Sequence, residues 1–294
     1  MITFNGKYLL AASQGNMRIT AMSMGSTDLL GTLWLKAETK NTLLAAFGND
    51  DGMKVIEATN AYLADLAKTG NQKAQALANY IYEDPMLVCS LGLQPQGMEM
   101  PIRWLGFNGQ GYIDTGYKPK TLHTQYEVGF VKTENNGDWR PIINNENDIR
   151  FGICCSSSSA NIGRTWVGNS TSYINKDFDC LVGEYYEVTI DKTGTQVNGV
   201  KYEASGVVDA NATLNACINT RYTATGVTSP ERSKFKLRYL KISEDGVEQR
   251  HFMPYMGGVL LDAKNGVIYE NAETGTLTLS YTLPDGTPWT PLNS

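Results

Sequence analysis

Beyond residue 101, apolar and polar residues alternate with a period of two, and turn residues interrupt the pattern at short intervals. In the stretch GEYYEVTID, Tyr186, Val188 and Ile190 fall on one face of an extended chain, and Glu187 and Thr189 fall on the other. This alternation is typical of a half-buried strand, because successive side chains of a strand point to opposite faces. About ten to twelve such segments, with no helical window between them, predict a two-sheet sandwich of the jelly-roll type.

The turns within this region support the same prediction. Asn198-Gly199 in TQVNGVKYE is a strong hairpin signal, because a two-residue turn needs residues that tolerate positive φ. In KFKLRYLKI the alternation of Phe235, Leu237 and Tyr239 breaks phase before Leu240. A change of phase within one strand predicts a β-bulge.

One glycine-rich stretch, GFNGQGYIDTGYKP (residues 106–119), comes close to a phosphate-binding loop. Tyr117 stands where the pattern requires lysine, and Pro119 follows Lys118. The next residues alternate as a strand and do not begin the helix whose N-terminus would hold the phosphate. We therefore interpret these glycines as turn residues between short strands.

The first hundred residues have a different pattern. Residues 49–70 are predicted to form an amphipathic helix that Asn49 and Asp50 cap, with Gly70 as its end and an apolar stripe of Met53, Ile56, Leu63, Leu66 and Ala67. Residues 71–85 predict a second helix, with Ala74, Leu77, Ala78 and Ile81 on one face. The short link between them predicts an antiparallel helical hairpin. The earlier stretches KYLLAAS, NMRITAMSM and LLGTLWLKAE fit either strands or short apolar segments.

The stretch LGLQPQGMEMP (residues 91–101) is rich in proline and glycine and indicates a domain boundary. We therefore expect an N-terminal region over residues 1–97, a β-sandwich over residues 98–282 and a C-terminal tail over residues 283–294.

Composition excludes several classes of function. The formal net charge of the 294 residues is -5 and no basic block is present, which disfavours a nucleic-acid partner. We expect no signal peptide and no membrane insertion, since the start MITFNGKYLLAASQGN lacks a basic and apolar leader and no apolar run is long enough to span a bilayer. The five cysteines are expected to be free and mostly buried, and neither their spacing nor the two histidines indicate a metal or cofactor site.

The ends of the β region resemble a known family. GQGYIDTGYKP resembles the first strand of concanavalin A-like, laminin-G-like jelly rolls that are frequent in proteins of gut bacteria and their phages. The stretch from residue 239 to residue 278 is similar to that family's closing pattern, in which a strand and a hairpin lead to an F-x-P turn, then to an Asp-containing strand and then to the element fY.n.gtGt. Eight residues fall on its positions: Phe252, Pro254, Asp262, Gly266, Tyr269, Asn271, Gly275 and Thr276. The resemblance spans residues 107–279, and the stretch GICCSSSSANIGRTWVGNSTSY departs from it.

This resemblance implies a non-enzymatic phage virion protein, either a capsid decoration or head fibre or a tail-associated adhesin. Its lectin-like jelly roll would face outward toward host-surface glycans, and residues 1–97 would dock on other virion proteins. Such proteins are commonly homo-oligomers, so a trimer is expected. The missing leader agrees with assembly in the host cytoplasm and a place on the virion surface. Two alternatives remain, a glycan-active hydrolase of the same fold and a purely structural cementing protein.

Catalytic candidates are weak in this sequence. Glu184, Glu187 and Asp191 do not fit the spacing of the acid pair in jelly-roll glycosidases, in which one carboxyl protonates the leaving oxygen and the other attacks. His123 and His251 give no reason to expect a Ser-His-Asp set. We therefore expect no catalytic residues.

Binding candidates come from two stretches, GDWRPIINNEND and NIGRTWVGNSTSY. Sugar recognition needs an aromatic face for the C–H surface of the ring, and amides or guanidinium groups for the hydroxyls. The residues that meet these needs are Trp139, Arg140, Asn144, Asn145, Arg164, Trp166, Asn169 and Tyr173. Either tryptophan, taken singly, also fits a place in the core of the sandwich. The stretch CCSSSSAN between them is predicted to be the tip of a loop.

Overall fold

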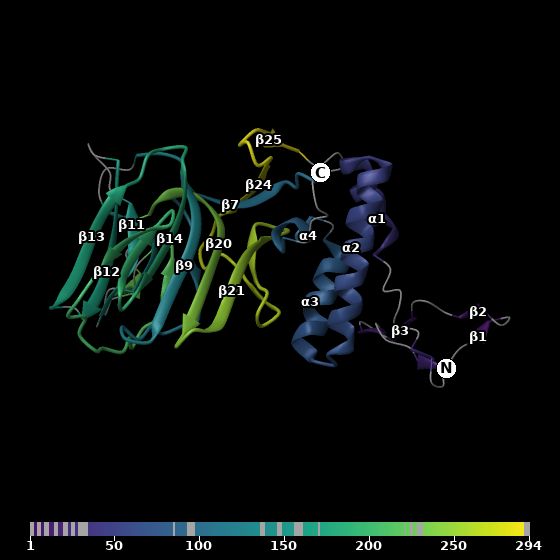
Figure 1. The fold of residues 1–294 in the computed structure, drawn as a ribbon, viewed down its shortest axis with the longest axis horizontal. Helices are drawn as coiled ribbons and strands as arrows, with labels where there is room; N and C mark the ends of the chain where they lie inside the picture. Colours follow the sequence, from purple (N-terminus) through teal and green to yellow (C-terminus); the bar gives the residue numbers. More distant parts are fainter. Residues whose placement is uncertain are drawn as a thin grey trace. The chain divides into compact units, whose positions relative to one another are not determined.

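The fold is that of a computed structural model, shown as a ribbon in Figure 1. The structure describes residues 35–84, 86–92, 98–135, 139–145, 149–155, 161–169, 171–220, 222–223, 226–227 and 232–290, and six short strands before residue 29. The chain divides into two compact units, one of residues 104–280 and the other of residues 1–103 with 281–294. The three-part division expected from the sequence stays a prediction.

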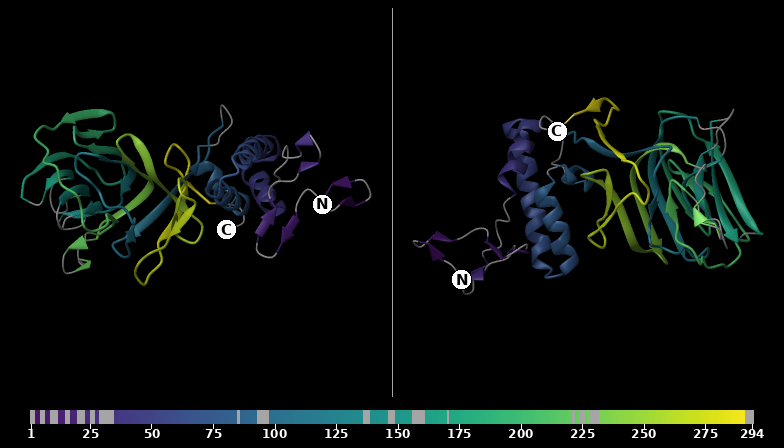
Figure 2. Two further views of the ribbon diagram at one scale, coloured as in Figure 1. Left: turned by 90° about the horizontal axis from the view of Figure 1, so that it is seen from below. Right: turned by 180° about the vertical axis from the view of Figure 1, so that it is seen from behind.

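The unit of residues 104–280 is mainly β, as the alternation predicts, and it is a two-sheet jelly-roll sandwich. Figures 1 and 2 show the two sheets face to face, with β13, β12 and β11 in one and β14, β9 and β20 in the other. The first sheet has six antiparallel strands in the order β13-β12-β11-β10-β17-β8. Their bounds are Ile113–Asp114 (β8), Arg140–Asn145 (β10), Ile149–Cys155 (β11), Ile162–Asn169 (β12), Tyr173–Asp179 (β13) and Cys217–Ile218 (β17).

The second sheet is larger and follows the order β16-β15-β14-β9-β20-β21-β22-β23, with β7 paired to β20 and to β24. Its strands span Ile102–Asn108 (β7), Thr124–Lys132 (β9), Tyr185–Asp191 (β14), Gly194–Val197 (β15), Val200–Glu203 (β16), Lys234–Glu244 (β20), Val247–Tyr255 (β21), Val259–Asp262 (β22), Val267–Tyr269 (β23) and Thr278–Thr282 (β24). The last residues of β24 pair with β25 (Pro288–Trp289), and β18 (Tyr222–Thr223) pairs with β19 (Gly226–Val227) as a separate hairpin.

One hydrophobic core lies between the two sheets. The central strands give alternate side chains to it, so that Tyr126, Val128 and Phe130 of β9 lie opposite Phe151 and Ile153 of β11. The rings of Tyr126 and Phe151 meet edge to face with centroids 4.8 Å apart. The remaining side chains of the same strands form the two outer faces of the sandwich.

The predicted turn and bulge are both confirmed. Asn198 and Gly199 have φ of 47° and 83° and join β15 to β16, as a hairpin with two residues of positive φ requires. The register of β20 against β9 shifts between Leu237 and Tyr239, where the alternation breaks phase. The bulge turns both Leu237 and Leu240 into the core.

The other unit contains four helices among its described residues: α1 (Ala37–Phe47), α2 (Asn49–Lys68), α3 (Gln72–Glu83) and α4 (Leu87–Ser90). The predicted helical hairpin corresponds to α2 and α3. The sequence analysis did not predict α1 or α4. α1 begins at Ala37, within LLGTLWLKAE, and its apolar residues gather in its second half, so they do not form the spaced stripe that marks a helical face.

The predicted ends and stripe of α2 are right only in part. Gly48 is the N-cap and Asn49 the first helical residue, so the capping role given to Asn49 and Asp50 is wrong. Asp50 instead lies in the first turn, where a negative charge favours the helix dipole. Gly70 follows the helix with φ of 60°, as expected. Met53 of the predicted stripe is exposed, and Val55 is buried in the helix face instead.

A buried ion pair joins the end of α3 to the start of β7. Arg103 donates from Nη1 to Asp84 Oδ2 at 2.6 Å and from Nη2 to Asp84 Oδ1 at 2.8 Å, and the two side chains are 0% and 1% exposed. The backbone N–H of Met86 also donates to Asp84 Oδ1. The guanidinium lies 5.5 Å from the centre of the Tyr281 ring. Two segments of this unit that are distant in sequence are thereby fixed to each other.

Before α1, six short strands pair as three separate hairpins: β1 (Thr3–Phe4) with β2 (Lys7–Tyr8), β3 (Ala12–Gln14) with β4 (Met17–Ile19), and β5 (Ser23–Met24) with β6 (Thr27–Asp28). KYLLAAS and NMRITAMSM therefore contribute short strands. Residues 29–34 of LLGTLWLKAE lie outside the described residues. None of the described helices is both long enough and apolar enough to cross a membrane.

Candidate functional site

The outer face of the six-stranded sheet carries most of the predicted binding residues. On β12, Val167 lies in the core and Thr165 contacts Thr195 of the other sheet, so these two point inward. Arg164 and Trp166 alternate with them and point outward. Trp166 is only 8% exposed although it is not part of the core between the sheets.

The strand register aligns these side chains in rows across the sheet. Arg164 pairs with Cys154 on β11 and with Asp177 on β13. Trp166 pairs with Gly152 and with Asn175, and Gly152 pairs in turn with Asn144 on β10. Residues directly opposite on neighbouring strands share a face, so amide, indole, guanidinium and carboxylate groups lie together on this outer face.

Trp139 completes a cluster around Arg164. The guanidinium carbon of Arg164 lies 4.1 Å from the centre of the Trp139 ring, and the Trp139 and Trp166 rings meet edge to face with centroids 6.2 Å apart. Arg164 also holds Asp177 at two points, through Nε and through Nη2, the latter at 2.7 Å. The hydrogen bond from Arg164 lowers the pKa of Asp177 below its usual value, and the same bond raises the pKa of Arg164.

A second aromatic and guanidinium pair lies one row further along the sheet. Arg150 of β11 and Tyr173 of β13 both pair with Gly168 of β12. The guanidinium carbon of Arg150 lies 4.2 Å from the centre of the Tyr173 ring, which is 36% exposed. Gly168 lies between them and has no side chain, so the side chains of Arg150 and Tyr173 can meet across β12.

The structure separates the eight predicted residues. Trp139, Arg164 and Trp166 are in contact, and Asn144 and Tyr173 share their face of the sheet. Three others lie apart from this cluster. Asn145 is fully buried and donates to the Leu214 carbonyl, and Arg140 begins β10 opposite the core residue Cys155. Asn169 closes the β12–β13 turn, where it accepts hydrogen bonds from Thr171 and Ser172.

The sequence analysis missed two members of the face, Arg150 and Asp177. Arg150 lies in β11, whose alternation predicts that it points away from the core, whereas the sequence YINKDFD of β13 does not alternate clearly around Asp177. Their partners were not predictable, because the register of β13 on β12 decides that Asp177 lies opposite Arg164. Within CCSSSSAN, residues 156–160 lie outside the described residues, and Cys154 and Cys155 end β11.

Glu184, Glu187 and Asp191, the three acids that did not fit a catalytic pair, have different environments in the structure. Glu184 accepts a hydrogen bond from the Tyr186 hydroxyl, and Asp191 accepts two from Thr193 in a turn. Glu187 instead lies on the outer face of the larger sheet, where Glu127 of the neighbouring strand β9 also lies. Burial raises the pKa of Tyr239 well above its usual value, and the carboxylates of Glu127 and Glu187 add to this through hydrogen bonds.

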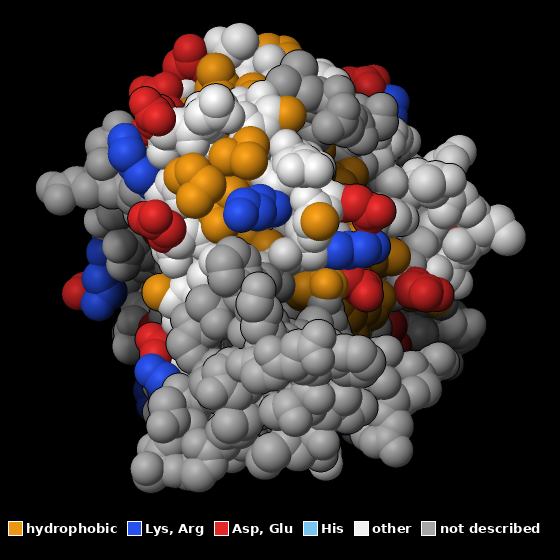
Figure 3. Space-filling view, turned by 90° about the vertical axis from the view of Figure 1, so that its right-hand side faces the viewer, with side chains coloured by type: hydrophobic (Ala, Val, Ile, Leu, Met, Phe, Trp, Pro, Cys, Tyr) orange, Lys and Arg blue, Asp and Glu red, His pale blue; other side chains and the backbone are white. Residues whose placement is uncertain are grey.

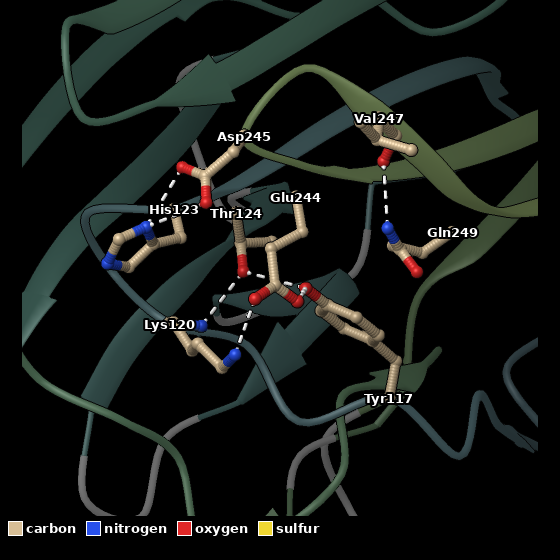
Figure 4. Close-up of polar contacts among 8 residues, drawn as sticks. All are labelled: Tyr117, Lys120, His123, Thr124, Glu244, Asp245, Val247 and Gln249. Atoms are coloured by element: carbon tan, nitrogen blue, oxygen red, sulfur yellow. Dashed lines mark hydrogen bonds and ion pairs between the residues drawn. The ribbon is translucent and has the colours of Figure 1, made fainter.

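A separate polar network lies where β20 turns into β21 (Figure 4). Glu244 pairs with Lys120 and accepts a hydrogen bond from the Tyr117 hydroxyl at 3.1 Å, and Tyr117 also contacts the Thr124 hydroxyl at 3.1 Å. The hydrogen bond from Lys120 lowers the pKa of Glu244. The network ties the segment before β9 to the hairpin, which is a structural role.

His123 lies beside the same turn, with Nδ1 2.9 Å from Asp245 Oδ1. A histidine that acts as a general base for a nucleophile needs a hydroxyl or thiol on its other nitrogen. Within the part of the chain that the structure describes, no such group is hydrogen-bonded to this ring. No cluster of three or more His, Cys, Asp or Glu side chains with the arrangement of metal ligands occurs among those residues either.

Comparisons with known proteins give distant similarities only. No family model and no curated protein matches the chain. Among solved structures, the chain is similar to a SAP-like pentraxin from Limulus polyphemus (TM-score 0.36, 12% identity, 48% of this chain and 75% of that one) and to a β-1,3-glucanase from Mycobacterium marinum (0.28, 11%, 51% and 76%). It also matches a Trypanosoma rangeli sialidase (0.30, 9%), covering 42% of this chain but only 20% of the sialidase. At these TM-scores the similarities assign neither a ligand nor an activity.

Proposed function

We propose that the protein binds carbohydrate at the outer face of the six-stranded sheet, and that it does so without catalysing a reaction. The observation that carries the proposal is the cluster of Trp139, Arg164 and Asp177 on this face. Arg164 and Asp177 lie on the neighbouring strands β12 and β13, and Trp139 directly precedes β10, so an aromatic ring, a planar guanidinium and a carboxylate are held next to one another.

The chemistry of the cluster fits a sugar ring. An indole offers an apolar surface to the C–H groups of a pyranose, while guanidinium N–H groups donate to hydroxyls and a carboxylate accepts from them. The ion pair with Asp177 offsets the charge of Arg164, which suits a ligand with many hydroxyls. Trp166 is nearly buried and packs against Trp139, so we assign it the role of supporting Trp139 and not that of contacting the ligand.

We further propose that this binding unit belongs to a phage virion surface protein, a capsid decoration, head fibre or tail-associated adhesin. The support is the family resemblance of residues 107–279. Residues 1–97 would make the contacts with other virion proteins, and the chain would assemble as a homotrimer. Figure 3 shows apolar side chains lying among acidic and basic ones on the face that it views.

One observation favours a second candidate, a glycan-active hydrolase. Glu127 and Glu187 lie on neighbouring strands of the larger sheet, with the Tyr239 hydroxyl between them. Two carboxylates on one sheet face are the groups that hydrolysis of a glycosidic bond requires. Incubation with mixed bacterial and host polysaccharides distinguishes the two functions: release of new reducing ends that is lost in Glu127→Gln and Glu187→Gln would establish the hydrolase and contradict the non-enzymatic proposal.

The binding proposal is tested on a glycan array, followed by calorimetric titration of the best ligand. We expect Trp139→Leu and Arg164→Met each to weaken binding by about tenfold, which corresponds to the loss of one stacked or charge-assisted contact. Trp289→Leu is the matched control, since Trp289 lies in the other unit. The affinity of this variant for the glycan should equal that of the wild type. An array without signal, or equal affinity in all three variants, contradicts the proposal.

The virion proposal is tested separately by immunogold labelling of phage particles. Label on intact particles supports it, and label confined to infected-cell lysate contradicts it. Light scattering of the purified full-length chain tests the trimer, and a monomer at micromolar concentration contradicts that part.

A further inference from the structure

Two of the free cysteines lie in contact within the core of the sandwich. The Sγ atoms of Cys155 and Cys180 are 3.5 Å apart, and the residues are 4% and 0% exposed. Cys155 is the last residue of β11, and Cys180 directly follows β13. The two strands are not neighbours, because β12 lies between them.

Gly163 of β12 allows this contact across a strand. Gly163 pairs with Cys155 on one side and with Phe178 on the other. A Cβ added at Gly163 would lie 2.1 Å from the Phe178 ring, so no side chain fits on the core side of β12 at this position. The Cys180 backbone N–H donates to the Asn161 carbonyl, which fixes the start of the segment after β13 beside β12.

From this contact we infer that Cys155 and Cys180 are a modification site that closes to a disulfide across β12. Each thiol gives up one proton and one electron, and the Sγ–Sγ bond forms. The oxidant is a small-molecule disulfide such as glutathione disulfide. Its S–S bond breaks, it accepts the two electrons and the two protons, and it leaves as two thiols after a mixed-disulfide intermediate.

The environment determines when this exchange takes place. The contact with Cys180, together with burial, raises the pKa of the Cys155 thiol well above its usual value, although the ammonium of the buried Lys132 acts in the opposite direction. Lys132 Nζ donates to the Cys180 carbonyl at 3.3 Å. Since only the thiolate attacks a disulfide, the folded Cys155 thiol reacts slowly. The bond therefore forms while the chain folds, before the core closes over it.

The bond would stabilise the sheet that carries the proposed binding face, although the inference itself does not depend on that function. It would close a loop that contains β12 and β13. The bond would lie on the core side of the sheet, whereas the side chains of Arg150, Arg164 and Tyr173 lie on its outer face. Loop closure of this length lowers the entropy of the unfolded chain. We expect a rise in melting temperature of about 10 °C for a sandwich of this size.

The test compares the full-length chain refolded from guanidinium in a glutathione redox buffer with the same chain refolded in dithiothreitol. In the redox buffer the number of free thiols, titrated after unfolding, should fall by two. Peptide mapping should then link the tryptic peptide that follows Arg150 to the one that follows Lys176. Because the first peptide carries both Cys154 and Cys155, mapping of the Cys154→Ala variant decides between them.

Cys154→Ala is also the matched control, since Cys154 is adjacent in sequence and points to the outer face. It should keep the link and the rise in melting temperature, while Cys155→Ala and Cys180→Ala lose both. The inference is overturned if all five thiols of the refolded wild-type chain remain free, or if the link forms through Cys154 or Cys217. A bond that forms without raising the melting temperature overturns its stabilising role.

Discussion

The guanidinium of Arg164 lies 4.1 Å above the ring of Trp139 and at the same time holds the carboxylate of Asp177. Replacing Arg164 by methionine keeps most of the side-chain volume and removes both interactions. We expect the free energy of unfolding to fall by about 1 kcal/mol, because each interaction at a partly exposed site contributes a fraction of that amount. Urea unfolding followed by tryptophan fluorescence measures the change.

The control is Lys118→Met, which removes a positive charge from an exposed position of the same unit. Its unfolding free energy should stay within about 0.5 kcal/mol of the wild type. Equal losses in the two variants would show that charge alone, and not the contact with Trp139, accounts for the effect of Arg164.

In the helical unit, Asp84→Ala leaves the buried guanidinium of Arg103 without its carboxylate. We expect a loss of about 3–5 kcal/mol, because an uncompensated charge in the interior is far more costly than the pair is favourable. The double variant Asp84→Leu with Arg103→Met should recover much of this loss, since it replaces the pair by apolar groups. Calorimetric unfolding of the full chain measures both.

The exposed pair Lys68 and Asp65 provides the comparison for that prediction. Asp65→Ala should cost about 0.5 kcal/mol or less. An Asp84→Ala variant as stable as Asp65→Ala would mean that water reaches Arg103.

Gly163→Ala is expected to destabilise the sandwich by about 1–3 kcal/mol, because the new methyl group overlaps the buried Phe178 ring. Phe178→Leu alone also destabilises, since it removes part of the core. Combined with Gly163→Ala it should cost less than the sum of the two single losses, because the smaller side chain makes room for the methyl group. A strictly additive double variant in urea unfolding would contradict the predicted overlap.

The network around Glu244 predicts a dependence of stability on pH. The hydrogen bond from Lys120 lowers the pKa of Glu244 in the folded chain relative to the unfolded one. The stabilisation is therefore present above the unfolded pKa of about 4.3 and is lost as the pH falls through the folded pKa. At pH 7, Glu244→Gln should cost about 0.5 kcal/mol, as is usual for a partly exposed pair.

Thermal melts of wild type and Glu244→Gln between pH 7 and pH 3 test this dependence. The two curves should separate at neutral pH and converge on the acid side. Glu203→Gln, at an exposed hairpin position, should follow the wild type throughout. A difference that grows as the pH falls would have the wrong sign for a carboxylate with a lowered pKa.

The fold class was predictable because the sandwich depends on local signals. Alternation assigned Tyr186 and Val188 to one face, which is the core face, and turn chemistry located the hairpin at Asn198-Gly199. The ends of α2 were less predictable, because a cap depends on which residue takes the first helical conformation. Gly48 took the place expected for Asn49.

The candidate face was predictable only as separate residues. Residue type indicated Trp139 and Arg164, but the contact between them depends on the registers that join β10 to β11 and β11 to β12. The addition of Asp177 depends on the register of β13 on β12. The same limit explains Asn145, which has the right chemistry for a sugar ligand but points into the protein. Whether a side chain faces inward or outward next to the bulge in β10 does not follow from simple alternation.

The pairing of β9 with β20 has a consequence for how the chain emerges from the ribosome. Glu127 and Lys241, 114 positions apart, lie opposite each other on these strands. At a translation rate of about 5–20 residues per second, Lys241 follows Glu127 by roughly 6 to 23 s. The other edge of β9 meets β14 much earlier. During this interval the nascent chain presents one open edge of a central strand, at which chaperones or neighbouring nascent chains can bind.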